Sequence, residues 1–204
     1  MKAHHERRVG VTEAIDSPGR SDNVDPKYRE MVDFLRGLGT EDVPHSGEKG
    51  FLAHLVAVCR DLEAWGCDRD LCRAGLFHSI YGTELFRRWS LPLERREEVR
   101  ALIGERAERL AFVNCMMDRT SFEVLLESDG DYCIRNRETG ESIELSRQDY
   151  DDLVYLRLCD WLEQVARSNR WDYRRDAIRK MAQRLGGVAE ESYRRVYAHE
   201  PAAR

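Results

Sequence analysis

The segment from Arg69 to Ile80 constrains the fold more than any other part of this 204-residue chain. It has helical spacing, and apolar or small residues lie on nearly all of its sides: Leu71, Cys72, Ala74, Gly75, Leu76 and Phe77. A helix without a broad polar face has to be covered all round by other elements, so this one belongs at the centre of a domain. We therefore expect an all-α bundle built around it.

Other stretches have the apolar spacing of amphipathic helices that pack around such a centre. They run from Lys27 to Gly37, from Phe51 to Trp65, from Pro92 to Met117 as one long helix, from Arg147 to Ser168, and as two short helices between Asp172 and Ala198. The helical period stops between Asp118 and Ser146, where two short β-like runs predict a small hairpin at about 131–145. Ser146 and Asp149 resemble a capping box that opens the next helix. These elements predict about six or seven helices with one inserted hairpin.

The polar, aperiodic residues 1–26 predict a flexible N-terminal arm, 27–198 a single domain, and 199–204 a tail. The net charge of −5 with 33 scattered Lys and Arg residues argues against a dedicated nucleic-acid surface. Apolar runs fall short of the roughly 20 residues that span a bilayer, and no signal-peptide pattern opens the chain, so we expect a cytoplasmic protein without a membrane partner. Six cysteines without paired C-x-x-C spacing predict buried, reduced thiols.

Three potential metal ligands occur within apolar helical patterns that are distant in sequence: His54, His78 and Asp160. Buried imidazoles and carboxylates lose solvation and need partners, so three such groups favour a shared polar centre. A divalent metal would satisfy them with two neutral nitrogens and one anionic oxygen. In the competing interpretation each histidine bonds a backbone carbonyl, and Asp160 pairs with an arginine such as Arg106.

A fourth ligand could come from His45, which precedes the His54 helix by about one loop. Imidazole is a common metal ligand, although a loop histidine can equally well lie exposed. Glu105 and Glu108 are weaker candidates, because both fall away from the apolar stripe of the long helix and are expected to face solvent.

Four more residues would suit the binding or conversion of a small substrate. Tyr81 and Thr83 follow His78 closely and could present hydroxyl groups, or simply belong to a helix end that a glycine stops. Arg106, within the apolar stripe, could clamp a phosphate or carboxylate or act as the partner of a buried acid. Asp118 lies at the end of the long helix and could line a pocket or form a local ion pair.

The stretch FLAHLVAVCRDLEAWGCDRDLCRAGLFHSIYGT resembles the start of an HD-superfamily domain, in which one helix supplies a histidine and the next ends in His-Asp. LRLCDWLEQV resembles the helix that supplies the last aspartate. The resemblance covers roughly residues 44–167 and implies an HD-like helical fold with metal ligands at His54, His78 and Asp160. The chain is similar, more closely, to an uncharacterised group of small bacterial HD-like proteins with HSIYGT-type and NRETGE-type segments.

Ser79 departs from the superfamily pattern, because it stands where the paired motif has its aspartate. A serine hydroxyl is a weaker ligand for a hard cation and cannot act as an equivalent base. The absence of histidine between Ser79 and Ala198 also argues against the dinuclear iron site of the superfamily's oxygenases.

The resemblance implies an enzyme with a single divalent metal (iron, manganese or zinc) that activates water or polarises an oxygen of a small-molecule substrate. Hydrolysis is the default chemistry, with His78, Ser79 and Tyr81 as catalytic residues and Arg106, Thr83 and Asp118 as substrate-binding residues. His45 would join the three metal ligands. The alternatives are lyase, isomerase or oxygenase chemistry on a small metabolite, and a non-catalytic ligand-binding or regulatory module on a degenerate HD scaffold. A homodimer stays open.

Overall fold

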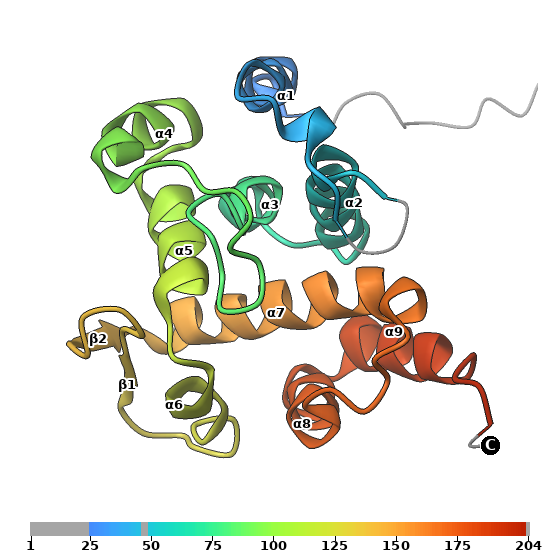
Figure 1. The fold of residues 1–204 in the computed structure, drawn as a ribbon. Helices are drawn as coiled ribbons and strands as arrows, with labels where there is room; N and C mark the ends of the chain where they lie inside the picture. Colours follow the sequence, from blue (N-terminus) through green and yellow to red (C-terminus); the bar gives the residue numbers. More distant parts are fainter. Residues whose placement is uncertain (1–24, 46–48, 203–204) are drawn as a thin grey trace, which may run out of the picture.

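The structure, a computed structural model, describes residues 25–45 and 49–202. Over this part of the chain it contains nine α-helices, two short 3-10 turns and one two-stranded sheet (Figure 1). The α-helices are α1 (Tyr28–Gly37), α2 (Phe51–Ala64), α3 (Arg69–Phe77), α4 (Arg96–Ile103), α5 (Glu105–Met116), α6 (Arg119–Glu123), α7 (Arg147–Ser168), α8 (Arg175–Leu185) and α9 (Gly187–Tyr197). The strands are β1 (Tyr132–Arg135) and β2 (Ser142–Leu145).

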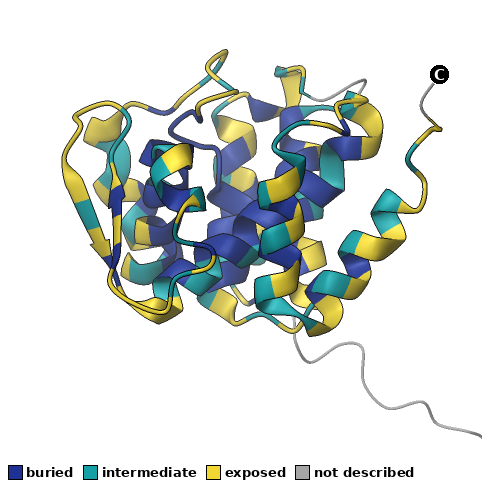
Figure 2. Ribbon diagram, turned by 90° about the horizontal axis from the view of Figure 1, so that it is seen from below, coloured by how far each residue is buried: buried dark blue, intermediate teal, exposed yellow. Residues whose placement is uncertain are grey.

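Helix α3 lies in the middle of the bundle, where it packs against α2, α4, α5 and α7 (Figure 1). Its apolar side chains are buried. Figure 2 shows that buried segments gather in the middle of the molecule and that exposed segments lie around them. Helix α7 is the longest and passes across α2, α3 and α5, while α8 and α9 cover its other side. The predicted all-α fold with a central apolar helix is confirmed.

Helices α2 and α3 approach each other closely at Gly75. A Cβ atom built on Gly75 would lie 2.5 Å from Cδ1 of Leu62 and 3.5 Å from Cγ1 of Val58, both on α2. Leu62 and Val58 are fully buried, so they have little room to move aside. The missing side chain of Gly75 therefore sets the spacing between the helices that carry His54 and His78.

The predicted long helix from Pro92 to Met117 is two helices in the structure. Gly104 has φ 98° and ψ 157°, a backbone conformation that side chains disfavour, and it ends α4 and starts α5 in a new direction. The helical period also resumes once after Asp118, because its side chain accepts a hydrogen bond from the backbone of Ser121 at 2.7 Å and caps the short helix α6. These two differences explain why there are more helices than expected.

The inserted hairpin is present, with β1 and β2 paired antiparallel and Ile134 opposite Ile143. Ser146 accepts a hydrogen bond from the backbone of Asp149 at 3.0 Å and caps α7 as predicted. Within the described part of the chain, no helix is both long and apolar enough to cross a bilayer. Asp25, the first described residue, is buried and accepts a hydrogen bond from Arg73 at 2.5 Å, which ties the start of the bundle to α3.

All six cysteines are free thiols. The predicted burial holds for Cys59, Cys72, Cys115 and Cys159. Cys133 is exposed because it occupies an outward position of β1, where alternate residues face opposite sides. Burial raises the pKa of Cys115 to about 12, so this thiol stays protonated at neutral pH.

Candidate metal centre

Three helices bring His54, His78 and Asp160 together in the interior. His54 lies on α2, His78 follows the last residue of α3, and Asp160 lies on α7. One ligand atom from each residue can be chosen so that all of them lie within 4.8 Å of one another. Both histidines are fully buried and Asp160 is 8% exposed, so this polar group is surrounded by the apolar core.

The hydrogen bonds of the two Nδ1 atoms decide which ring nitrogens are available. His78 Nδ1 lies 2.7 Å from the carbonyl oxygen of Gly75, which can only accept, so Nδ1 donates and carries the proton. His54 Nδ1 lies 2.5 Å from Oε2 of Glu163 and donates in the same way. In the neutral tautomers both Nε2 atoms therefore present lone pairs, as metal ligands do.

These two Nε2 atoms face each other and the same carboxylate oxygen. The Nε2 atoms are 3.2 Å apart, and Oδ1 of Asp160 lies 3.2 Å from that of His54 and 3.4 Å from that of His78. Three acceptors this close repel one another unless a proton or a metal cation lies between them. The donor set of two imidazole nitrogens and one carboxylate oxygen suits a divalent transition metal.

The histidines and the carboxylates of this group shift the pKa values of one another. Burial lowers the pKa of His54, but hydrogen bonds to Asp160 and then to Glu163 outweigh it and raise that pKa above its ordinary value. Burial raises the pKa of Asp160, yet the positive charge that His78 has when protonated and the hydrogen bond that a protonated His54 donates hold it well below its usual range. Asp160 is therefore ionised and available as an anionic ligand.

Glu163 belongs to this centre, although sequence reasoning did not select it. It follows Asp160 by three residues on α7 and so shares its helix face, a spacing visible in the sequence. Burial raises its pKa, but hydrogen bonds from His54, Lys49 and Arg167 lower it to about 2. An ionised carboxylate on Nδ1 fixes the orientation of His54 and directs Nε2 towards His78 and Asp160.

We expect the substitution Glu163→Gln to lower the affinity for a divalent metal by about 10- to 100-fold, the usual loss when the partner of a metal-bound histidine is removed. The pKa of His54 should fall at the same time, because the carboxylate that raises it is gone. Metal titration and the NMR titration of the His54 ring measure the two effects. Glu190→Gln, on the surface helix α9, is the matched control. An unchanged His54 titration would contradict this role.

His45 lies beside the group without joining it. Its ring stacks on that of His54 with centroids 4.3 Å apart, and both of its nitrogens are buried without a hydrogen-bond partner. Burial, and then the charge of His54, lower the pKa of His45 to about 4, so the ring is neutral at neutral pH. A stacked ring directs its nitrogens past its neighbour, so His45 would have to turn in order to bind the same ion.

A cavity of about 260 Å³ lies beside the three candidate ligands, His54, His78 and Asp160, which we call the metal group, and Asp160 lines it. The expected site residues His45, Ser79 and Thr83 line it, together with Phe86 and Trp161. Ser79 is 4% exposed, and Thr83 accepts a hydrogen bond from the backbone of Phe86 at 3.1 Å. Four arginines that sequence reasoning did not select for this site also line the cavity: Arg88, Arg119, Arg157 and Arg170.

Tyr81 is committed elsewhere, as the donor of a 3.0 Å hydrogen bond to Glu108. Burial raises the pKa of this phenol, and Tyr81 does not line the cavity at Asp160. Glu108 is fully buried and binds Arg96 through both carboxylate oxygens, at 2.7 and 2.9 Å. The expectation that Glu108 faces solvent is wrong, because the break at Gly104 changes the direction of α5 relative to one continuous helix.

Arg106 and Asp118 are also placed away from the cavity. Arg106 bridges the start of α7 to the start of α3, with Asp152 as one partner and Asp68 as another at 3.2 Å. Asp118 caps α6. The expected substrate-binding roles of these two residues find no support in this geometry, since both side chains complete local structure.

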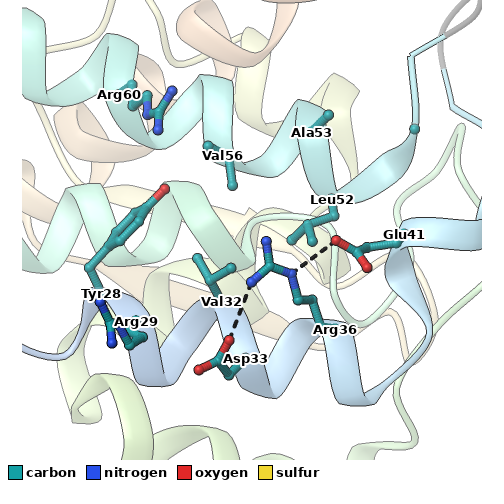
Figure 3. Close-up of a pocket in the computed structure, with 11 residues that line it drawn as sticks. Tyr28, Arg29, Val32, Asp33, Arg36, Glu41, Leu52, Ala53, Val56 and Arg60 are labelled. Carbon is teal, nitrogen blue, oxygen red and sulfur yellow. Dashed lines mark hydrogen bonds and ion pairs between the residues drawn. The ribbon is translucent and has the colours of Figure 1, made fainter.

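A larger cavity of about 700 Å³ lies between α1 and α2, and His54, His78 and Asp160 do not line it (Figure 3). Figure 3 shows Arg36 spanning it to Asp33 at 3.3 Å and to Glu41 at 2.9 Å. Aliphatic side chains such as Val32 and Val56 line it, and the described residues around it include neither a histidine nor a cysteine. We therefore place the candidate site at the smaller cavity, where the ligands meet.

Comparison with known proteins gives a fold relationship. Residues 34–119 match the model of DUF6817, a domain of unknown function. No curated protein matches the sequence. Among solved structures, a metazoan ortholog of SpoT that hydrolyzes ppGpp and plays a role in starvation responses matches with a TM-score of 0.57 at 14% identity, over 90% of this chain and 100% of that chain. At this identity the likeness shows that the two chains share a mostly helical fold.

Proposed function

We propose that this protein is a metal-dependent hydrolase of a small molecule, with the metal bound by His54, His78 and Asp160. The observation that carries this proposal is the convergence of two Nε2 lone pairs and one ionised carboxylate within 4.8 Å in an apolar interior. A bound divalent cation would supply the chemistry by lowering the pKa of a water molecule and polarising a substrate oxygen. The helical fold, shared with a ppGpp hydrolase, supports the same class of reaction.

The residues around the ligands have roles of their own in this proposal. Glu163 and the carbonyl of Gly75 hold the two imidazole rings by their Nδ1 atoms. Asn114 and Cys115 donate to the backbone carbonyl of His78, which fixes this residue just beyond the end of α3. The substrate would enter the cavity beside Asp160 and lie against Ser79, whose hydroxyl can form a hydrogen bond with it.

A second candidate function is a ligand-binding module that has lost catalysis. It is favoured by Ser79, which provides no carboxylate to act as a fourth ligand or as a base. The two functions differ in one measurable way, because a module without metal would keep its ligand after the histidines are replaced.

The proposal predicts about one equivalent of a divalent metal in protein that is purified without a chelator or a histidine tag. His54→Ala and Asp160→Ala should both lose it, since a centre with three protein ligands cannot spare one. His199→Ala, an exposed histidine, is the matched control and should keep the metal. Element analysis after purification, and again after exposure to iron, manganese and zinc, measures the outcome.

Turnover is the second half of this test. Metal-loaded protein should hydrolyse a member of a panel of small phosphate and carboxylic esters, and Asp160→Ala should not. A wild-type protein that takes up none of the three metals would contradict the metal-centred mechanism. Metal uptake without hydrolysis of any ester would instead leave the binding module as the better description.

A further inference from the structure

Two arginines with almost no exposed surface lie against the cavity beside the metal group. Arg119 is 4% exposed and Arg157 is 2% exposed, and both line the cavity. Arg119 has partners, since its Nη1 donates to the hydroxyl of Tyr173 at 2.7 Å and its Nε lies 3.4 Å from a carboxylate oxygen of Glu84. Arg157 is far less well satisfied.

Among the described residues, the one acceptor within hydrogen-bond distance of Arg157 is Oδ2 of Asp160, at 3.5 Å. Its Nε is buried without any partner. A guanidinium group has five N–H donors, and burying a charge with its donors unpaired is strongly unfavourable. A residue in this condition calls for an acceptor, which a molecule bound in the cavity would supply.

The charges that line the cavity point to an anion. Four arginines (Arg88, Arg119, Arg157 and Arg170) face one carboxylate, that of Asp160, which the two imidazoles already engage. Arg119 and Arg157 are both guanidinium groups with almost no exposed surface, and both line this cavity. An oxyanion between the two guanidinium groups would relieve both their repulsion and the loss of solvation.

The size of the cavity limits the molecule that carries this anion. Its volume is about 260 Å³, which is below the roughly 300–1,000 Å³ of pockets that enclose drug-sized ligands. Phe86 and Trp161 provide aromatic surface, and Ser79 and Thr83 also line the cavity. A compact molecule with one anionic group and a few carbon atoms fits this description.

We infer that Arg119 and Arg157 form an anion-binding subsite next to the metal ligands, and that the substrate is a compact oxyanion, either a phosphate ester or a carboxylic acid. That the anion is a substrate rests on the proposed function, but the binding of the anion does not require turnover. Arg157, whose Nε is unpaired, can offer paired N–H donors to two oxygens of the anion, which a lysine could not do, and Arg119 adds a second positive charge.

The experiment measures anion binding to the full-length chain, with and without added metal, by calorimetry and thermal unfolding. The probes are inorganic phosphate and malonate, with sodium chloride at matched ionic strength. We expect one of the two anions to bind and to raise the unfolding temperature. Arg157→Met should weaken that binding by at least about tenfold. Arg36→Met, which removes one positive charge at the separate cavity of Figure 3, should bind like the wild type.

The outcomes distinguish a phosphate ester from a carboxylic acid, and they separate a failure of the anion-binding subsite from a failure of the proposed hydrolase function. Binding of phosphate identifies a phosphate ester as the substrate class, and binding of malonate identifies a carboxylic acid. Arg157→Lys keeps the positive charge but lacks the planar guanidinium group. It should also bind the anion more weakly, and it provides a second test if Arg157→Met does not fold. Failure of both anions to bind, or equal binding by Arg157→Met, overturns the subsite. Anion binding without any hydrolysis would contradict only the proposed function.

Discussion

Exchange of Asp160 for asparagine should lower turnover at least about a thousandfold, equivalent to about 4 kcal/mol of transition-state stabilisation. Asparagine has nearly the same shape, so the packing around α7 is kept while the negative charge is lost. The two Nε2 atoms that lie 3.2 and 3.4 Å from Oδ1 would then face a neutral oxygen or an amide nitrogen. A metal ion bound there would lose its anionic ligand, and Arg157 would lose its carboxylate neighbour.

The measurement is the rate of metal-dependent ester hydrolysis, together with the metal content of each purified protein. Asp176→Asn, an exposed carboxylate on α8 that pairs with Arg179, is the matched control and should leave both unchanged. Circular dichroism shows whether the Asp160 variant is folded. Retained hydrolysis in a folded Asp160→Asn protein would contradict the assignment of this residue as a ligand.

Gly75→Val should destabilise the protein by about 3 kcal/mol, because the new side chain enters the contact between α2 and α3. The first added atom alone would lie 2.5 Å from Leu62 Cδ1. For a domain of this size the unfolding temperature should fall by roughly 6–12 °C. Metal affinity should fall as well, since His54 and His78 lie on opposite sides of the same contact.

Two further variants test the cause of that loss. Gly37→Ala, at the exposed end of α1 with nothing within 4 Å of the new Cβ, should be neutral or stabilising by up to about 1 kcal/mol. The double variant Gly75→Val with Leu62→Ala should be less destabilised than the sum of its single variants, because each change makes room for the other. If the losses of stability are additive, the close approach of α2 and α3 at Gly75 is not the reason for the destabilisation.

The arrangement of helices was predictable because burial leaves a periodic trace in the sequence. The all-apolar segment before His78 predicted the central helix, and Ser146 with Asp149 predicted the start of α7, as observed. The break at Gly104 was missed, since the apolar spacing continues on both sides of it and a helical glycine is common. The same break explains the wrong prediction for Glu108, which turns inward instead of facing solvent.

The site was predictable in its centre and not in its surroundings. His54, His78 and Asp160 stood out because each interrupts an apolar face. Glu163 and Arg157 share a helix with Asp160, at three residues on either side, and this spacing would have indicated both. Arg119 comes from another part of the chain, and the sequence does not show which distant segments lie close together in space. The likeness to small bacterial HD-like proteins stays a prediction.

The three ligands come from helices that are far apart along the chain, and an ion shared among them would act as a cross-link. It would bind the folded state in preference to the unfolded chain, which cannot hold the three groups together. By mass action, each tenfold rise in free metal above the dissociation constant would then add about 1.4 kcal/mol to the free energy of unfolding. The amount of folded protein in a cell would thus follow the supply of that metal.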